Sequence, residues 1–463
     1  MKPGRILLFM AAVIGLLAAL GEVVPAEGFT FGRRHIGFLS LHTLVADREA
    51  AQTVTTEAAE PPEMRALRDS VDYYRMLVHE SDTRFWLPDE HYLDAFWQAA
   101  EAARRQGRTL RVLHYGDSQI EMDHITSRLR SRLQARFGGG GPGMVPFRTI
   151  TPSLTVSQST SGELTHLSSF GDSTVVRSRG DYGPMMQCFR LAGEATVTLR
   201  AARSSSVDDR AKRFSRVTLL FNSRGTRFRA DLTDRQHKTT VSQQQDGPAI
   251  GSFVWTLDSA SASLRLRAVG SADLYGVLLD DGPGVAVDNI PMRGCSGQQF
   301  TLVPQEKLGA AYARMDVGLV ILQFGGNSVP YLKTSKQIST YCQALGHQID
   351  HVRRCCPSAR ILFVGPSDMS TRLRGQLQTY PALPELVDSL AATATAHGAA
   401  YWSIFHAMGG LNSMPQWSRQ GLAGQDYIHF SQRGADLMGD RLGEALDNSY
   451  RLYRLEKKMR KKK

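Results

Sequence analysis

The sequence predicts an α/β fold that is interrupted by a β-rich segment. Strand-then-helix patterns occur before about Phe147 and again after Asp281, whereas the region between them has short alternating or β-branched segments and no helical pattern. The chain has 463 residues, of which 42% are hydrophobic and 21% charged, as in ordinary globular proteins of two or three domains. We therefore expect one α/β domain whose sequence encloses a β-sandwich.

The N-terminus has the pattern of a secretory signal. A short basic segment precedes the apolar run from Ile6 to Leu20, and Ala26 supplies a small residue for cleavage. The alternative is an uncleaved signal anchor that extends to about Val24 and attaches the protein to a membrane. Export is expected in either case.

Residues 44–62 are rich in Ala, Thr and Glu and predict a linker. Helical patterns follow from Met64 to about Val78 and from Asp89 to Gln106. The first part of the α/β domain then begins with a buried strand at Val112 to Tyr115. After a sharp turn, apolar residues every four positions predict a helix face, formed by Ile125, Leu129, Leu133 and Phe137. Gly138, Gly140 and Gly143 have dinucleotide-binding spacing, but they follow a helix rather than a strand, which indicates a plain glycine turn.

The central region has the signature of a β-sandwich. Its strand-like segments are 195–200, 216–221, 252–257 and 263–268, with Gly, Asn, Asp and Ser turns between them. Buried parallel strands are expected next at 317–326 and 359–367, with helices at 334–355, 383–397 and 431–447.

Charge and cysteine content exclude several classes of protein. The net charge is +11, but the last ten residues carry seven cations and one anion, so the rest of the chain is only +5. This distribution predicts a solvated basic tail and argues against a nucleic-acid partner. Five cysteines do not form a disulfide scaffold at this length, although one bond among Cys188, Cys295 and Cys342 stays open. His347 and His351, with Cys355, have metal-ligand spacing but lack an H-E-x-x-H motif, so we expect a surface helix face and no metal.

Two segments carry candidates for nucleophilic catalysis. Gly116-Asp117-Ser118 lies where a strand ends and a helix begins, so the Ser118 hydroxyl can face a cleft; a plain helix cap is the alternative. Serine needs a base, and neutral imidazole suits that role when a carboxylate orients it. Asp426 and His429 lie three residues apart just before a helix, where both can face one site or act as a cap and a surface histidine.

Two further segments offer donors for an oxyanion. Gly325-Gly326-Asn327 ends a predicted strand, at the edge of the sheet where open parallel sheets bind ligands. Arg293-Gly294-Cys295-Ser296-Gly297 has glycines that let a backbone N–H approach a substrate oxygen. Plain glycine turns are the alternative for both segments.

In order, these four segments resemble the conserved blocks of the SGNH (GDSL) hydrolase superfamily. The resemblance covers residues 111–137 and 285–445, and it implies a three-layer α/β/α fold without a metal or cofactor. It implies that Ser118 is the nucleophile and that His429 is the base, oriented by Asp426. It also implies an oxyanion hole formed by the Ser118 N–H, the Gly297 N–H and the Asn327 side chain.

The departure from a minimal member is the long gap between Ser118 and Gly297. An inserted β-domain there resembles the peptidoglycan O-acetylesterases of bacterial cell envelopes. The resemblance implies a periplasmic or envelope serine esterase that removes an O-acyl group, expected to be acetyl, from peptidoglycan or another polysaccharide. The alternatives are an O-acyltransferase of the same superfamily and a non-catalytic glycan-binding envelope protein.

Several other residues near these blocks are further candidates. Gln119 and Asp123 can touch the acyl or alcohol side, and His114 and His124 compete with His429 as a base, although His114 fits a core histidine better. Asp368 fits a turn cap, and Trp402 and Trp417 fit core packing better than sugar stacking. The expected layout has six parts: a signal peptide or anchor (1–26), a linker with an N-terminal helical segment (27–84), the first α/β part (85–147), a carbohydrate-binding-like β-sandwich (148–284), the second α/β part (285–450) and a basic tail (451–463).

Overall fold

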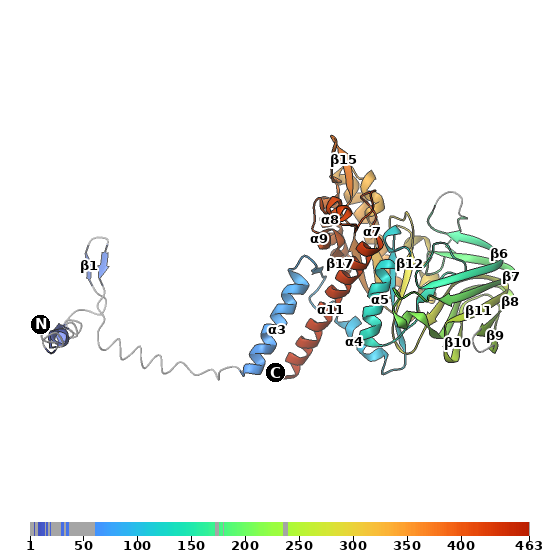
Figure 1. Cartoon of the computed structure of the whole chain (residues 1–463), viewed down its shortest axis with the longest axis horizontal. Helices are drawn as coiled ribbons and strands as arrows, with labels where there is room; N and C mark the ends of the chain where they lie inside the picture. Colours follow the sequence, from blue (N-terminus) through green and yellow to red (C-terminus); the bar gives the residue numbers. More distant parts are fainter. Residues whose placement is uncertain are drawn as a thin grey trace. The chain divides into compact units, whose positions relative to one another are not determined.

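The computed structural model describes residues 61–462 apart from 172–175, 179 and 235–238, and short segments within residues 4–36 (Figure 1). These residues divide into two compact units, 1–68 and 69–463. In the first unit, β1 (Phe29–Phe31) pairs antiparallel with β2 (Arg34–Ile36). Most of the predicted signal segment, its cleavage site and the linker to residue 60 lie outside the described residues. Among the helices that are described, none has both the length and the apolar character needed to cross a bilayer.

The centre of the second unit is a six-stranded sheet. Its strand order is β12 (Gly284–Pro291), β4 (Thr109–Gly116), β13 (Val317–Gln323), β14 (Arg360–Gly365), β17 (Ala400–Ser403) and β3 (Phe85–Trp86). The first five strands are parallel, and the short β3 joins the edge in the antiparallel direction. The apolar runs predicted at 317–326 and 359–367 are thus confirmed as parallel strands, and their continuous burial follows from helices on both faces.

Helices cover both faces of this sheet. One face packs against α6 (Gln305–Tyr312), α7 (Ser335–Cys355) and α8 (Leu383–Ala396). The other packs against α4 (Asp94–Ala103), α5 (His124–Phe137) and α11 (Gln432–Lys462). Successive residues of β4 alternate between these two cores, because side chains along a strand point to opposite faces. The result is the expected three-layer α/β/α arrangement, and both Trp402 and Trp417 are buried in its core, as expected.

The central region forms one bent antiparallel sheet. Its strands are β5 (Gly143–Val145), β6 (Val156–Ser168), β7 (Gln187–Ala201), β8 (Phe214–Asp234), β9 (Thr239–Asp246), β10 (Ala249–Ser261) and β11 (Ser263–Asp280). β8 pairs with β10 through its first half and with β9 through its second half, so it belongs to both parts of the sheet. Phe221 and Phe228, from the two halves of β8, lie with ring centroids 4.6 Å apart in one shared core. The four strand segments predicted here are confirmed, but they join one continuous sheet rather than the two sheets expected of a β-sandwich.

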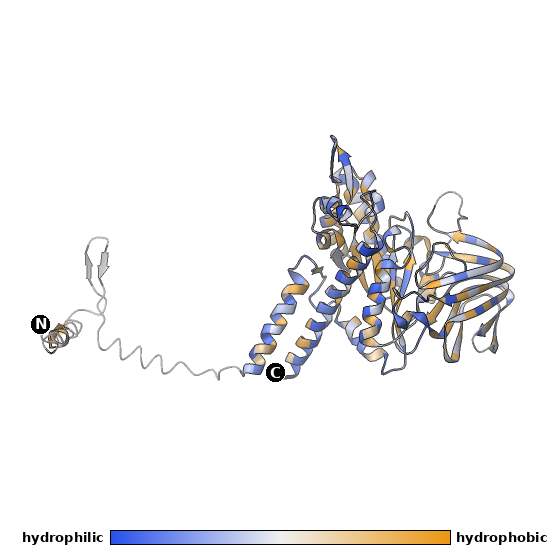
Figure 2. Ribbon diagram, viewed as in Figure 1, coloured by the Kyte–Doolittle hydropathy of each residue, from blue (hydrophilic) through white to orange (hydrophobic). Residues whose placement is uncertain are grey.

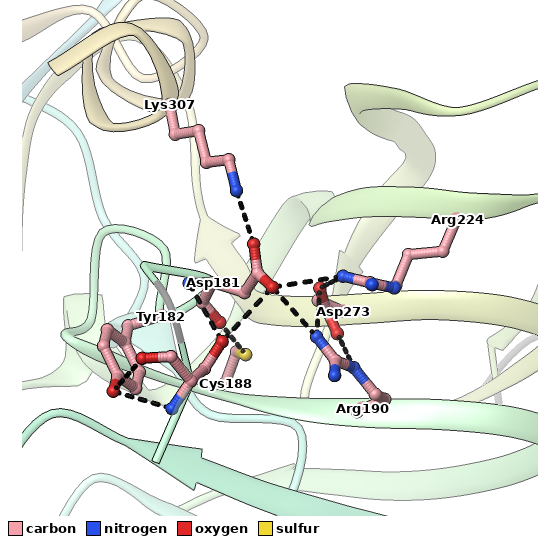
Figure 3. Close-up of polar contacts among 8 residues, drawn as sticks. Asp181, Tyr182, Cys188, Arg190, Arg224, Asp273 and Lys307 are labelled. Carbon is pink, nitrogen blue, oxygen red and sulfur yellow. Dashed lines mark hydrogen bonds and ion pairs between the residues drawn. The ribbon is translucent and has the colours of Figure 1, made fainter. Parts of the chain in front are cut away.

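A charged network joins this β-region to helix α6 (Figure 3). Asp181, before β7, accepts hydrogen bonds from Lys307 of α6 at 2.5 Å, from Arg190 at 3.2 Å and from Arg224 at 3.3 Å. The fully buried Asp273 of β11 binds the same two arginines. Partial burial alone would raise the pKa of Asp181, but the hydrogen bond and charge of Lys307 and the neighbouring groups outweigh it and lower the pKa. Breaking one partner would leave a poorly hydrated charge, so this network fixes the β-region on the α/β layers.

The predicted basic tail is helical, which corrects that expectation. Residues 451–462 continue α11 without a break, and Leu452 and Tyr453 are buried against the second core. Arg454 and Lys457 contact the carboxylate of Glu101 at 3.2 and 3.1 Å. Blue and orange residues alternate along α11 in Figure 2, because the helix buries one side while its cations face solvent. All five cysteines are buried and free, so the disulfide considered among three of them is absent.

Candidate active site

A cavity of about 190 Å³ opens at the carboxyl edge of the sheet. Loops that follow three adjacent strands line it: Asp117 and Ser118 follow β4, Gly326 and Asn327 follow β13, and Pro366 follows β14. His429, from the loop before α11, closes the wall. Ligands of open parallel sheets bind at this edge, where the loops of several strands converge.

The cavity contains a Ser–His–Asp relay. Ser118 Oγ lies 2.9 Å from His429 Nε2, and His429 Nδ1 lies 2.7 Å from Asp426 Oδ2. Partial burial alone would raise the pKa of Asp426, but hydrogen bonds from the His429 ring and from two backbone N–H groups outweigh it and lower the pKa. Asp426 is therefore ionised at neutral pH. An Nδ1–H that donates to this carboxylate leaves the Nε2 lone pair directed at the serine hydroxyl.

The short loop that carries His429 is held by hydrogen bonds to its own backbone N–H groups. Asp426 Oδ1 accepts the N–H groups of Ile428 and His429 at 3.1 and 3.2 Å, while its other oxygen binds the imidazole. Gly424 N–H donates to the His429 carbonyl at 2.8 Å. Tyr427, between them, has a left-handed backbone with φ of 56°, which a non-glycine residue adopts only when surrounding bonds enforce it. The three-residue spacing thus lets one carboxylate both close the turn and orient the ring.

Gln119 connects the serine segment to the histidine loop. Its Nε2 donates to the Ile428 carbonyl at 2.7 Å, and its Oε1 accepts the Phe430 N–H at 3.3 Å. These bonds lie on either side of His429. Gln119 also lines the cavity, so the expectation that it can touch substrate stays a prediction, and its amide has the additional role of fixing the loop beside Ser118.

Ser118 is the first residue of a short 3₁₀ helix, Ser118–Ile120, rather than of the α-helix that was expected. Asp117 caps this turn by accepting the Gln119 N–H at 3.0 Å. Gly116, two residues before Ser118, packs closely on this turn, because an added Cβ would lie 3.0 Å from the Ile120 side chain, which would then have to shift. Helix α5 starts only at His124. The Ser118 N–H is still the first donor of a helical turn and has no partner within that turn.

The predicted oxyanion donors differ in where they point. Asn327 lines the cavity, and its Nδ2 donates to Asp117 Oδ2 at 3.2 Å and to the Cys295 carbonyl at 3.1 Å. Gly297 does not line the cavity, and its N–H is directed at Cys295 Sγ at 3.4 Å. Its φ of 87° and the contact of its Cα face with the Phe324 ring leave no room for a side chain. The structure therefore brings together Ser118, His429, Asp426 and Asn327, and leaves the Gly297 N–H turned aside.

Asp117 is a site residue whose full role the sequence did not reveal. Sequence reasoning treated it only as a cap, but its second oxygen also holds Asn327. Burial raises the pKa of Asp117 to about 6, although the Gln119 N–H and the Asn327 amide favour its charged form. Its position directly before the serine was the only available signal, since Asn327 is 210 residues away.

The remaining candidates do not line the cavity, and His124, the first residue of α5, is one of them. His114 is fully buried between Gln323 and Thr126, as a satisfied core histidine. Asp123 is also buried, where it binds both Nη atoms of Arg130 and accepts from Thr155, so the expectation that it touches substrate is wrong.

Asp368 is fully buried and accepts the Met414 N–H and the Thr379 hydroxyl at 2.7 and 2.8 Å, which agrees with a turn cap. Of the three residues expected on a surface helix face, only His347 is exposed, because His351 and Cys355 are buried and His351 hydrogen-bonds the Val303 carbonyl; the expectation is wrong for these two residues. Within the described residues, no cluster of His, Cys, Asp or Glu is arranged to hold a metal.

Comparisons with known proteins agree with this architecture. Residues 258–437 match the model of the GDSL-like Lipase/Acylhydrolase family, a range that contains three of the four blocks; Ser118 lies outside it, beyond the β-region. A solved structure of a peptidoglycan O-acetylesterase has 23% identity and a TM-score of 0.62 and covers 77% of this chain and 96% of its own.

Two other solved structures are similar to smaller extents. A family two carbohydrate esterase from Clostridium thermocellum has 12% identity and a TM-score of 0.26 and covers 62% of this chain and 98% of its own. The periplasmic domain of a Salmonella ser. Paratyphi A lipopolysaccharide acetyltransferase has 15% identity and a TM-score of 0.26 and covers 35% and 73%. No protein with a curated description matches the sequence.

The match of residues 258–437 to the GDSL-like Lipase/Acylhydrolase family and the likeness in fold confirm the resemblance to SGNH (GDSL) hydrolases. The likeness in fold to the peptidoglycan O-acetylesterase structure extends over more of the chain than the α/β layers alone.

Proposed function

We propose that this protein is an exported serine esterase that hydrolyses O-acetyl esters on a glycan, with peptidoglycan as the expected polymer. The observation that carries the proposal is the continuous relay from Ser118 through His429 to Asp426, with contacts of 2.9 and 2.7 Å, inside a cavity at the carboxyl edge of the sheet. This is the arrangement that activates a serine hydroxyl.

In the first half of the reaction, Ser118 Oγ attacks the acetyl carbonyl carbon while His429 Nε2 takes the hydroxyl proton. The carbonyl double bond opens and its oxygen becomes an oxyanion. The imidazolium then gives the proton to the sugar oxygen as the ester bond breaks, which releases the alcohol and leaves acetyl-Ser118. Asp426 holds the ring and stabilises its positive charge throughout.

Deacylation repeats these steps with water. His429 takes a proton from water, the hydroxide attacks the acetyl carbonyl carbon, and the second oxyanion collapses to acetic acid as His429 returns the proton to Ser118; the acid then ionises to acetate in solution. Because the cavity is about 190 Å³, below the usual range for drug-sized ligands, it suits a short acyl group with the sugar at its mouth.

The oxyanion needs hydrogen-bond donors in place before charge develops. Asn327 Nδ2 and the Ser118 N–H lie at the cavity, and Asp117 holds the amide of Asn327 in position. The Gly297 N–H joins them when its loop turns this donor from Cys295 Sγ toward the oxygen. Burial raises the pKa of the Cys295 thiol to about 12, so this sulfur stays neutral and releases the N–H at low cost.

The substrate class is inferred from the fold neighbour and the pattern of the chain. The similar structure is described as a peptidoglycan O-acetylesterase, and the first residues have the pattern of an export signal. In this proposal the enzyme works in the periplasm or cell envelope. The β-region at 148–284, which belongs to the same compact unit as the α/β layers, is expected to bind the glycan.

The test is hydrolysis of p-nitrophenyl acetate and release of acetate from O-acetylated peptidoglycan by residues 27–463. Ser118→Ala and His429→Ala are expected to abolish both, while Ser204→Ala, at an exposed turn of the β-region, retains them. A Ser118→Ala variant with wild-type turnover would refute the proposal. Adding an unacetylated chito-oligosaccharide separates hydrolysis from acyl transfer, because only a transferase yields acetylated acceptor.

A further inference from the structure

A second cavity lies next to the catalytic one. It has a volume of about 430 Å³, within the range that small ligands occupy, and it is lined by Leu332, Lys333, Thr371, Tyr380 and Glu385 among others. Thr371 belongs to β15 (Ser370–Leu373), which forms a hairpin with β16 (Gln376–Thr379). This hairpin projects at the top of Figure 1.

The two cavities are lined by neighbouring residues on two segments of the chain. On one side, Pro330 and Tyr331 line the catalytic cavity, and the chain passes directly into Leu332 and Lys333 of the second. On the other side, Met369 lines the catalytic cavity, and its carbonyl accepts the N–H of Tyr380 at 3.0 Å, which lines the second. The two cavities are therefore neighbours along both segments, although no residue lines both of them.

Tyr331 lines the catalytic cavity and directly precedes Leu332, which lines the second cavity. Its side chain is 76% exposed, an unusual state for a large aromatic group in a folded domain. It ends the 3₁₀ segment η4 (Gly326–Tyr331) that begins beside the oxyanion donor Asn327, so its position is tied to the reaction centre. A rigid exposed aromatic ring offers contact area at little cost in conformational entropy.

We propose that Tyr331 is a stacking platform and that the second cavity is a subsite for the sugar next to the acetylated one. This inference rests on the proposed esterase function and names how that site selects a polymer. The apolar C–H face of a pyranose ring packs on the tyrosine ring, while Lys333, Thr371 and Glu385 offer hydrogen-bond partners for its hydroxyl groups. Leu332 and Tyr380 provide the apolar floor.

The chemistry of the lining favours an uncharged sugar ring. Lys333 and Glu385 have opposite charges and both are exposed, so their fields largely cancel and favour neither an anionic nor a cationic ligand. Hydrolysis of one acetyl ester needs only the catalytic cavity. The second cavity therefore adds affinity for a polysaccharide and not for an isolated acetylated sugar. The expected kinetic signature is therefore a lower KM for longer substrates with kcat little changed.

The experiment compares kcat/KM for O-acetylated glucosamine as a monosaccharide and as a tetrasaccharide of the chitin type. Wild type should prefer the tetrasaccharide, and Tyr331→Ala should reduce the ratio of the two kcat/KM values about fivefold to tenfold through KM. Tyr331→Phe should restore the ratio, since it keeps the ring. Thr371→Trp, which fills the second cavity, should also reduce it. Tyr73→Ala, an exposed tyrosine of α3 (Pro62–His79), is the matched control and should leave both rates unchanged.

Equal kcat/KM on both chain lengths in an active wild type would overturn the subsite and leave the esterase function intact. A ratio unchanged by Tyr331→Ala and Thr371→Trp would overturn it as well. A folded wild type that hydrolyses neither these sugars nor p-nitrophenyl acetate refutes the proposed function itself, and the subsite falls with it.

Discussion

Asp117→Asn should change how the stability of this protein depends on pH. Asp117 is buried next to the nucleophile, and its pKa in the folded protein is about 6, above the value near 4 of an unfolded chain. Its contribution to stability is therefore fully present below about pH 4 and is lost as the pH rises through about 6. Asparagine has nearly the same shape but cannot ionise, so the variant lacks this loss.

The magnitude follows from the pKa difference. A raised pKa of about two units corresponds to about 3 kcal/mol in the free energy of unfolding. The variant also loses an acceptor for Asn327, because its own amide faces the Asn327 amide. That loss does not depend on pH, so it lowers the free energy of unfolding by the same amount at every pH and leaves its pH dependence unchanged.

The assay is urea unfolding of wild type and Asp117→Asn at a series of pH values from about 4 to about 7.5, which brackets the two pKa values. The free energy of unfolding of the variant minus that of wild type should rise by about 3 kcal/mol over this range and then level off. Asp258→Asn, at an exposed site of the β-region, is the matched control. A difference that stays constant between pH 4 and 7 would refute the assignment of the raised pKa to Asp117.

Three further predictions test the relay and the C-terminal helix. Asp426→Asn should reduce kcat on p-nitrophenyl acetate on the order of a hundredfold or more, because it removes the carboxylate that orients His429; unchanged kcat would contradict that role. Gln119→Ala should reduce kcat about tenfold with the thermal unfolding temperature little changed, because it frees the loop on both sides of His429 at the cost of two hydrogen bonds. Deleting residues 454–463 should lower the free energy of unfolding by about 1–3 kcal/mol, since Glu101 loses two cationic partners. A truncated protein as stable as wild type would instead support the interpretation of these residues as a solvated tail.

Much of the fold could be predicted because its signals are local. The apolar residues Ile125, Leu129, Leu133 and Phe137 lie on one buried face of α5, as their spacing predicts. The site was also accessible, because residues that end adjacent parallel strands meet at one edge whatever their separation in sequence. That rule alone predicts that Ser118 and Asn327 lie at one edge of the sheet.

Other parts depend on contacts that no local pattern reports. Asp117 and Asn327 are 210 residues apart, and Gln119 and Ile428 are 309 apart, so neither pair has a signature in the chain. The Gly297 block indicated a flexible backbone but not the direction of its N–H. At the C-terminus, the seven cations in ten residues predict a solvated tail, whereas the segment is helical and its apolar residues Leu452 and Tyr453 extend the buried side of α11. Composition describes the exposed side of such a helix and overlooks the buried one.

The position of the β-region has a consequence for how the chain folds. β4 and β12 are neighbours in the parallel sheet, yet more than 160 residues separate them, so pairing them first would close a very long loop. Pairing of β5 with β11 closes most of that distance beforehand and lowers the loop-closure cost by about 1 kcal/mol. The sheet that holds Ser118 is thus expected to complete only after the β-region has folded. A destabilised β-region would then delay the appearance of activity during refolding, even in variants whose catalytic residues are intact.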